Sequence, residues 1–501
     1  MRDMPGKTSI AVLLLALFTA VPLFAETDKE PEGKIFTLWP FVDYRESPRE
    51  GYSNLSILGP LFKLQRRGDD RDLVVRPFFY DSSNQRNGTE ETDYLYPLAA
   101  SSSSAETSRT QVLEFYQHNT YRKNEEERRE EGKMLFPFYI EGSSPKYGPY
   151  KSIFPFYGDI YERFWRDEYH YVMFPLYGRT VKDGKTTRNY LYPIFSLTSG
   201  EKEHGFQLWP IYGESEKEGV YKRRFVLWPF FLRETEGLDT ENPTSRFYLL
   251  PLYAALDSPK SSSRYYLWPF FGRRIDTEGN QEERDYFWPF WRTIRGEKRT
   301  LDSWLPFYSL DVRRETRKRW IMWPLLKHEE ITSDLFCQEK NRFLFFLYTD
   351  DRQSWPKAEG EKLRTTLWPF FVYKRNPRGI KSVTVPAPVE PILDKEGIEK
   401  NWAPLWRIYQ QRWNDRGDSA VSFLWNLYWH ERRGSDLAFE LFPFIYYRSE
   451  GRLTDLRIIK GLISFRNESG NKAISFFWMP FGLRWGITDV GGSAPIARSG
   501  P

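Results

Sequence analysis

Residues 264–273 read Arg-Tyr-Tyr-Leu-Trp-Pro-Phe-Phe-Gly-Arg, an aromatic segment centred on Pro269 and bounded by charged residues. Aromatic and aliphatic residues occupy both alternating sets of positions, so both faces of an extended strand would be apolar at its centre. Proline has no N–H to donate to a strand ladder, and it therefore belongs at an irregularity, a strand end or a corner. The segment predicts β-structure with a break at Pro269.

The same apolar-Pro-apolar motif recurs along the whole chain, and between Pro137 and Pro324 it returns on average about every 19 residues. A short unit repeated in this way predicts an architecture in which each unit packs against its neighbours. We therefore expect the central aromatic side chains to pack against adjacent repeats. The tryptophan copies, which we interpret as structural repeat centres, are Trp39-Pro40, Trp209-Pro210, Trp228-Pro229, Trp268-Pro269, Trp288-Pro289, Trp323-Pro324 and Trp368-Pro369.

Polar segments with hairpin-turn chemistry separate the copies of the motif. Asp183-Gly184 and Asn87-Gly88 are pairs that tolerate the positive φ of a type I′ turn. The flanking residues are rich in Tyr, Phe, Trp, Val and Thr, which favour strands, and no window sustains the spacing of an amphipathic helix. The sequence thus predicts an all-β fold of antiparallel meander or hairpin repeats.

One hairpin can be aligned residue by residue. With Asp183-Gly184 as its turn, Tyr177 opposes Tyr190, and the same register continued pairs Phe174 with Pro193. Each strand would then contain about 14 residues and extend roughly 45 Å.

Two architectures follow from the position of the proline. If each repeat is one long strand, some 22 to 24 strands of about 20 residues form a meander, which we expect to close into a large β-barrel. If each proline marks a corner, each repeat is a short hairpin, and the alternative is a hairpin solenoid or a propeller-like stack.

The chain divides into five predicted segments. An apolar stretch of about ten residues after a basic start is typical of an export signal. The segments are a signal peptide (1–25), the aromatic-Pro β-repeat region (26–375), a proline-rich insertion or loop (376–402), a continuation of the repeats (403–486) and a disordered tail (487–501).

The sequence contains no recognised catalytic, metal-binding or cofactor-binding motif. It has five histidines and a single cysteine, Cys337, which excludes an internal disulfide framework. Carboxylate pairs such as Asp159 and Glu162 recur in the turns, as the solvated rim of a repeat requires. A net charge of +5 is too small on this chain to indicate a nucleic-acid partner. We expect no enzyme activity and no cofactor.

These features favour a non-enzymatic, exported cell-envelope protein. We expect an outer-membrane β-barrel of a Gram-negative bacterium, with a pore or structural role and outer-membrane lipid as its partner. The alternative is a soluble periplasmic or secreted repeat scaffold for adhesion, assembly or glycan binding, whose partner is a glycan or an envelope protein.

Overall fold

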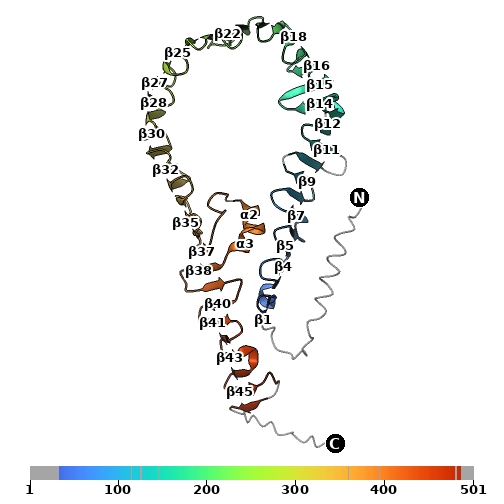
Figure 1. Cartoon of the computed structure of the whole chain (residues 1–501), viewed down its shortest axis with the longest axis vertical. Coiled ribbons are helices and arrows are strands. Elements are labelled where there is room, and N and C mark those ends of the chain that lie inside the picture. The colour runs from blue at the N-terminus through green and yellow to red at the C-terminus, as the bar shows by residue number, and fades with distance from the viewer. Residues whose placement is uncertain are drawn as a thin grey trace, which may run out of the picture.

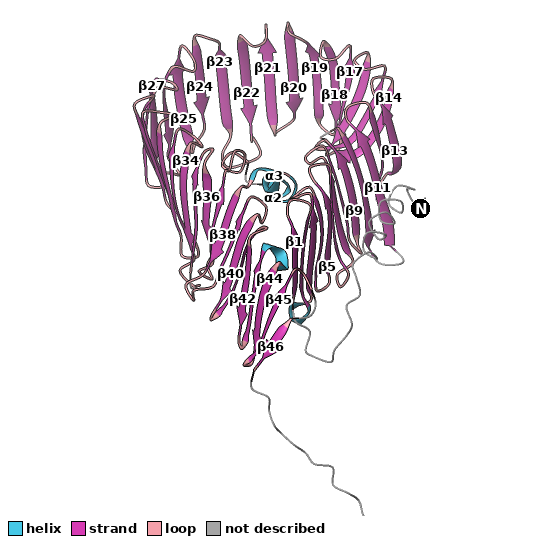
Figure 2. Cartoon of the chain, turned by 60° about the horizontal axis from the view of Figure 1, so that its bottom comes forward, coloured by secondary structure: helices cyan, strands magenta, loops and turns pink. Residues whose placement is uncertain are grey.

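The computed structural model describes residues 33–113, 115–123, 127–144, 146–358, 360–393, 395–479 and 482–486. Within these residues the chain forms 46 strands, each paired antiparallel with the next along the chain in one meandering sheet. The sheet curves round into an elongated loop (Figure 1), and its strands stand side by side as a wall one layer thick (Figure 2). The predicted signal peptide (1–25) and tail (487–501) lie outside the described residues.

The strands of the first half are β1 (Lys34–Leu38), β2 (Val42–Ser47), β3 (Tyr52–Ile57), β4 (Phe62–Arg67), β5 (Asp70–Val75), β6 (Phe79–Asn84), β7 (Thr89–Tyr94), β8 (Ala99–Ser103), β9 (Thr107–Val112), β10 (Tyr116–Lys123), β11 (Glu127–Leu135), β12 (Tyr139–Ser144), β13 (Gly148–Ile153), β14 (Tyr157–Arg163), β15 (Arg166–Val172), β16 (Tyr177–Lys182), β17 (Lys185–Tyr190), β18 (Phe195–Gly200), β19 (Glu203–Leu208), β20 (Tyr212–Lys217), β21 (Tyr221–Val226), β22 (Phe231–Glu236) and β23 (Thr244–Leu249).

Those of the second half are β24 (Tyr253–Asp257), β25 (Ser261–Tyr266), β26 (Phe271–Asp276), β27 (Gln281–Phe287), β28 (Trp291–Gly296), β29 (Arg299–Trp304), β30 (Tyr308–Arg313), β31 (Thr316–Ile321), β32 (Leu326–Thr332), β33 (Cys337–Phe343), β34 (Tyr348–Ser354), β35 (Glu361–Leu367), β36 (Phe371–Arg375), β37 (Lys381–Val385), β38 (Tyr409–Trp413), β39 (Ser419–Phe423), β40 (Tyr428–Arg433), β41 (Asp436–Leu441), β42 (Ile445–Glu450), β43 (Leu453–Ile458), β44 (Ile463–Glu468), β45 (Asn471–Phe476) and β46 (Leu483–Trp485). The helical turns are η1 (Pro48–Glu50), α2 (Glu396–Asn401), α3 (Ala403–Trp406) and η2 (Ile459–Gly461).

Each repeat is a hairpin of two short strands, most of them five to seven residues long. The predicted register around Asp183-Gly184 is confirmed as far as Tyr177 opposite Tyr190, the last pair between β16 and β17. Its continuation to longer strands is wrong, because the chain turns on both sides directly beyond that pair. A strand of six residues extends about 20 Å, roughly half the predicted length.

The prolines of the repeat lie in the turns that join each odd-numbered strand to the following even-numbered strand. We call this row of turns the aromatic edge, and the row that joins even-numbered to odd-numbered strands the polar edge. Each tryptophan and proline that the sequence marks as a repeat centre lies in a turn of the aromatic edge, and the bonds between them are cis. A proline loses nothing at these positions because its missing N–H is not part of a strand ladder.

The predicted closure into a β-barrel is not found. Among the described residues β1 pairs only with β2 and β46 only with β45, so ladder hydrogen bonds leave the sheet open. The hairpin unit of the alternative architecture is present, but the hairpins pair edge to edge in one sheet and do not stack as a solenoid or propeller. The two ends of the sheet instead pass beside each other (Figure 1).

Cross-strand ion pairs cover the faces of the sheet, where a second layer would otherwise pack. Glu329 on β32 accepts hydrogen bonds from Lys318 Nζ at 2.8 Å and Lys327 Nζ at 2.7 Å. Burial alone would raise the pKa of Glu329, but the two ammonium groups lower it to about 2. Faces paired in this way are suited to contact with water.

A local hydrophobic cluster forms where the wall bends. Ile140, Tyr150 and Ile160 are buried against one another on β12, β13 and β14. The pairing between β13 and β14 covers only Ser152 and Ile153, so the next hairpin is free to fold toward the face of β12.

Glycines near the aromatic edge accommodate aromatic rings from the adjacent strand. Gly213 on β20 lies opposite Phe225 on β21, and a Cβ at Gly213 would lie 2.2 Å from a ring carbon of Phe225. Gly178 is the second residue of β16, as Gly213 is of β20, and each follows a tyrosine. A Cβ at Gly178, however, would lie 3.9 Å from its nearest neighbouring atom. The two glycines thus differ in surroundings while sharing their place in the repeat.

We predict that Gly213→Ala lowers the free energy of unfolding by about 1–3 kcal/mol, because the new methyl group overlaps the ring of Phe225. The matched control Gly178→Ala should stay within about 0.5 kcal/mol of the parent. Urea unfolding followed by tryptophan fluorescence measures both changes. In a Phe225→Ala background Gly213→Ala should cost less than it does in the parent, and equal effects of the two glycine substitutions would contradict the overlap.

Candidate functional site

Outside the segment 386–408, each described turn of the aromatic edge that contains a proline exposes a large apolar side chain directly after it. These side chains are between 38 and 64% exposed. Successive hairpins place them about 10 Å apart, twice the spacing of neighbouring strands. The row consists of Phe41, Leu61, Phe78, Leu98, Phe138, Phe156, Leu176, Ile194, Ile211, Phe230, Leu252, Phe270, Phe290, Phe307, Leu325, Phe370 and Phe444.

The repeat-centre tryptophans pack along the edge only in part. The rings of Trp209 and Trp228, in successive turns, lie 5.9 Å apart between centroids. Of the tryptophans that the sequence marks, Trp39, Trp209 and Trp368 are half-buried, whereas Trp228, Trp268, Trp288 and Trp323 are between 40 and 49% exposed. The aromatic side chains contact their neighbours sideways and leave an outer surface uncovered.

In several of these turns every backbone N–H group is satisfied within the sheet. In the turn at 227–230, Leu227 N–H donates to Ile211 O at 2.7 Å, Trp228 N–H to Pro210 O at 2.7 Å and Phe230 N–H to Leu227 O at 2.9 Å. The remaining position is proline, which has no N–H. The turn therefore presents apolar side chains without leaving a backbone donor that needs water.

Charged side chains are rare in the turns of the aromatic edge. Outside the segment 386–408, the described residues of these turns include two, Arg76 and Lys460. Lys460 pairs with the buried carboxylate of Glu440. The polar edge carries charged and glycine-containing turns instead, with Trp165, 90% exposed, as an apolar exception.

The two ends of the sheet meet in a contact region that we call the seam. Arg45 Nη1 on β2 lies 2.7 Å from Glu431 Oε1 on β40, and the Arg45 guanidinium lies 4.5 Å from the ring centroid of Trp429. Trp39 Nε1 donates to Leu424 O at 2.8 Å. Side chains make these contacts, and they join hairpins that share no ladder hydrogen bonds.

The helices α2 and α3 extend the seam. They lie in a segment that leaves the sheet between β37 and β38 and projects toward β4–β7 (Figure 1). Trp402 Nε1 donates to Tyr96 O at 2.7 Å, and Asn401 Nδ2 donates to Asp93 Oδ2 at 2.8 Å. Arg76 Nε donates to Lys400 O at 2.9 Å.

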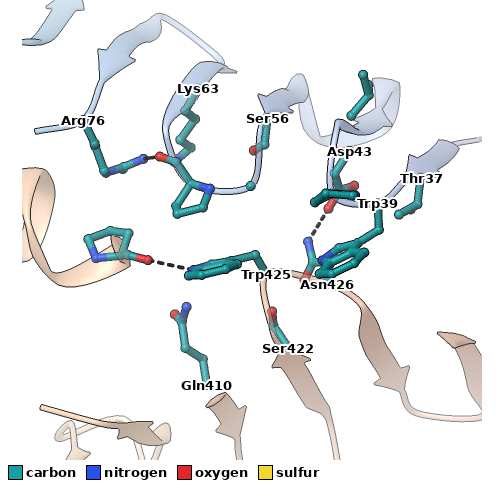
Figure 3. A pocket seen from close by; sticks show the side chains of 15 residues that line it. Thr37, Trp39, Asp43, Ser56, Lys63, Arg76, Gln410, Ser422, Trp425 and Asn426 are labelled. Carbon is teal, nitrogen blue, oxygen red and sulfur yellow. Dashed lines mark hydrogen bonds between the residues drawn. The ribbon is translucent and has the colours of Figure 1, made fainter. Parts of the chain in front are cut away.

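A pocket of about 310 Å³ lies in the seam. Figure 3 shows Lys63 and Arg76 on the side of the first strands, Gln410 on the side of the last strands, and Trp425 between them. Turns of the aromatic edge, including Trp39-Pro40, form part of its wall. The volume is at the small end of the range for ligand sites.

The pocket is cationic. Burial, together with the nearby Arg76 charge, lowers the pKa of Lys63 to about 8, and burial lowers the pKa of Arg76 to about 10. The two hydrogen bonds of Arg76 go to carbonyl oxygens, of Lys400 and Pro60, and not to a carboxylate. Lys63 has no ion-pair partner among the described residues.

Other titratable groups are distributed over the open faces. Asp159 and Glu162, the carboxylate pair considered from the sequence, make separate contacts: Asp159 Oδ1 lies 2.5 Å from His170 Nδ1, and Glu162 Oε2 accepts from Ser144 Oγ at 2.5 Å. Cys337 is half-buried on β33. The described residues contain no group of three or more His, Cys, Asp or Glu placed to hold a metal ion.

No helix in the described part of the chain has the length and apolar character needed to cross a membrane. Comparison with known proteins found no matching family model and no matching curated protein.

Neither the seam nor its pocket was predicted from the sequence. The repeat motif located Trp39-Pro40, but the pocket also needs Lys63 on β4 and two residues in turns of other hairpins, Arg76 and Trp425. The sequence contains one feature that could have indicated the pocket. In Arg76-Pro77-Phe78 an arginine replaces the aromatic residue before the proline of the motif.

We predict that Lys63→Met raises the free energy of unfolding at pH 7 by about 1–3 kcal/mol, since it removes a charge that the folded state disfavours. The folded-state pKa of Lys63 is lower than its ordinary value of 10.5, so the penalty is full below about pH 8 and disappears above about pH 10.5. The gain should therefore shrink across that window. Urea unfolding at pH 7, 9 and 10.5 tests this, with Lys182→Met at the polar edge as the control. A gain independent of pH would contradict it.

Proposed function

We propose that this protein is a non-enzymatic structural protein of the cell envelope that lies on a lipid bilayer with its aromatic edge embedded in the interface. One observation carries the proposal: the row of exposed apolar side chains on a single edge of the wall. Exposed apolar surface of this extent marks an interaction site, and Trp and Phe side chains favour the membrane interface.

The backbone of the edge supports the same proposal. A group that enters lipid must have its N–H and C=O groups satisfied, because each unsatisfied group costs several kcal/mol. In the turn at 322–325, Met322 N–H and Trp323 N–H donate to carbonyls of the preceding turn at 2.7 and 2.6 Å, and Leu325 N–H donates to Met322 O at 2.7 Å. Pro324 supplies no donor. The N–H groups of such turns therefore add no desolvation cost when the turn enters an apolar medium.

The lengths of the strands favour a protein that inserts only its aromatic edge into the bilayer. They disfavour strands that cross the bilayer. Strands that cross a bilayer need about 9–11 residues and present an apolar band about 25 Å tall to lipid. Most strands here have five to seven residues, and ion pairs such as Arg292–Glu283 at 2.7 Å occupy their faces. We therefore propose shallow insertion, about 5–10 Å, as for interfacial proteins.

The outer membrane of a Gram-negative bacterium is the bilayer we propose, because the sequence begins with features of an export signal. A soluble periplasmic or secreted scaffold that covers a partner protein or a glycan with its aromatic edge is the second candidate. The ion-paired faces of the wall are equally compatible with both candidates. The experiment must therefore distinguish lipid from a protein or glycan partner.

We predict that the chain from residue 26 onward binds phospholipid vesicles and that Phe230→Ser, Leu252→Ser and Phe370→Ser together weaken this binding by about 10–100-fold. Each replaced side chain is more than half exposed, and each contributes about 0.5–0.9 kcal/mol on entering the interface. Vesicle flotation over a range of lipid concentrations measures the partition coefficient.

The matched control replaces three exposed apolar residues of the polar edge, Trp165, Leu238 and Leu335, by serine. It should bind vesicles as the parent does. Equal loss in both triple variants, or no flotation of the parent protein, would contradict the proposal. A dimer in sedimentation velocity that only the aromatic-edge variant dissociates would instead assign the edge to protein contacts.

A further inference from the structure

The seam pocket lies at the level of the aromatic edge. Its wall includes Trp39-Pro40 and Gly59-Pro60, both in turns of that edge, and Pro404 from α3. The ring of Trp425 packs on the first strands, 3.6 Å from the position of a Cβ on Gly59. A molecule that enters at the edge therefore meets an aromatic wall first.

Two cations line this pocket without a carboxylate partner at ion-pair distance. Arg76 donates only to carbonyl oxygens, at 2.8 and 2.9 Å, and Lys63 has no ion-pair partner in the part of the chain that the structure describes. The one carboxylate of the wall, Asp43, is already held by Arg45 at 3.3 Å and by Asn426 Nδ2. The pocket thus has an excess of positive charge.

Uncharged donors surround the same space. Thr37 is 2% exposed, and its Oγ1 has no hydrogen-bond partner among the described residues. That oxygen has almost no accessible surface, so Thr37 forms part of the wall and does not contact a molecule in the pocket. Ser422 and Gln410 supply a hydroxyl and an amide from the opposite wall (Figure 3).

We propose that the seam pocket binds a phosphate group, either on the headgroup of an anionic lipid or on a small phosphate ester in solution. A phosphate oxygen accepts hydrogen bonds from ammonium and guanidinium groups, which are the donors that Lys63 and Arg76 offer. The volume of about 310 Å³ is large enough for a phosphate-bearing headgroup. The lipid source rests on the proposed function, whereas phosphate binding itself does not.

Binding should depend on pH through Lys63. Its charged neighbours are Arg76 and Asp72, and Asp43 stands in the pocket wall. Burial and Arg76 lower the pKa of Lys63 to about 8, and a bound phosphate favours the charged lysine. Affinity for phosphate should therefore decline as the pH rises from 8 to 10.

Titration of the chain from residue 26 onward with inorganic phosphate and with glycerol 3-phosphate, at constant ionic strength, tests the proposal. Trp39 and Trp425 line the pocket, so tryptophan fluorescence reports occupancy, and calorimetry gives the dissociation constant. Lys63→Met should weaken binding at least tenfold, whereas Lys182→Met at the polar edge should leave it unchanged. Because Lys63→Met is expected to stabilise the fold, loss of binding in this variant is not a loss of structure.

Vesicles separate the two sources. If Lys63→Met weakens flotation with phosphatidylglycerol-containing vesicles and leaves binding to phosphatidylcholine vesicles unchanged, the phosphate is a lipid headgroup. If Lys63→Met affects only the soluble phosphates, the ligand is a free ester. If phosphate binding depends on Lys63 and the protein binds no vesicles, the proposed phosphate site is supported and the proposed membrane function is contradicted. Unchanged binding of every probe by Lys63→Met, or no saturable binding at all, overturns the pocket proposal.

Discussion

The structure depends on one turn, in which proline occupies a position that needs no N–H. The residues around it donate to carbonyls of the same turn or of the preceding one, as Leu227 and Trp228 do. A hairpin end of this kind has no backbone donor left for water, so its side chains can all be apolar. Repeated on alternate hairpin ends, the turn concentrates the apolar surface of the protein on one edge.

The polar character of the strand faces follows from the concentration of apolar side chains on one edge. With aromatic groups at one edge, the strand faces need no second layer and carry cross-strand ion pairs such as Lys318–Glu329. Ladder hydrogen bonds between neighbouring strands supply the continuity. The buried cluster at Ile140 forms only where the wall bends and two of its strands face each other.

The sequence predicted the local structure correctly because turn chemistry and strand propensity are local. Asp183-Gly184 set a register that the structure reproduces as far as Tyr190, and strand composition identified the all-β class. The continuation through Pro193 failed because an apolar run carries the same alternation in a strand and in a turn. The predicted barrel closure was wrong, and the seam could not be predicted, since Arg45 meets Glu431 across 386 residues and no periodicity encodes that contact.

An open meander also has a consequence for how such a chain changes in evolution. Both neighbours of any hairpin are hairpins of the same kind, so duplication or loss of one repeat of about 19 residues creates no new interface. Each event would lengthen or shorten the wall by two strand spacings, about 10 Å. The contacts of α2 and α3 with the first strands lie outside the region between β8 and β37. Repeat number in that region can therefore alter the circumference of the loop while the meeting point of its ends is inherited unchanged.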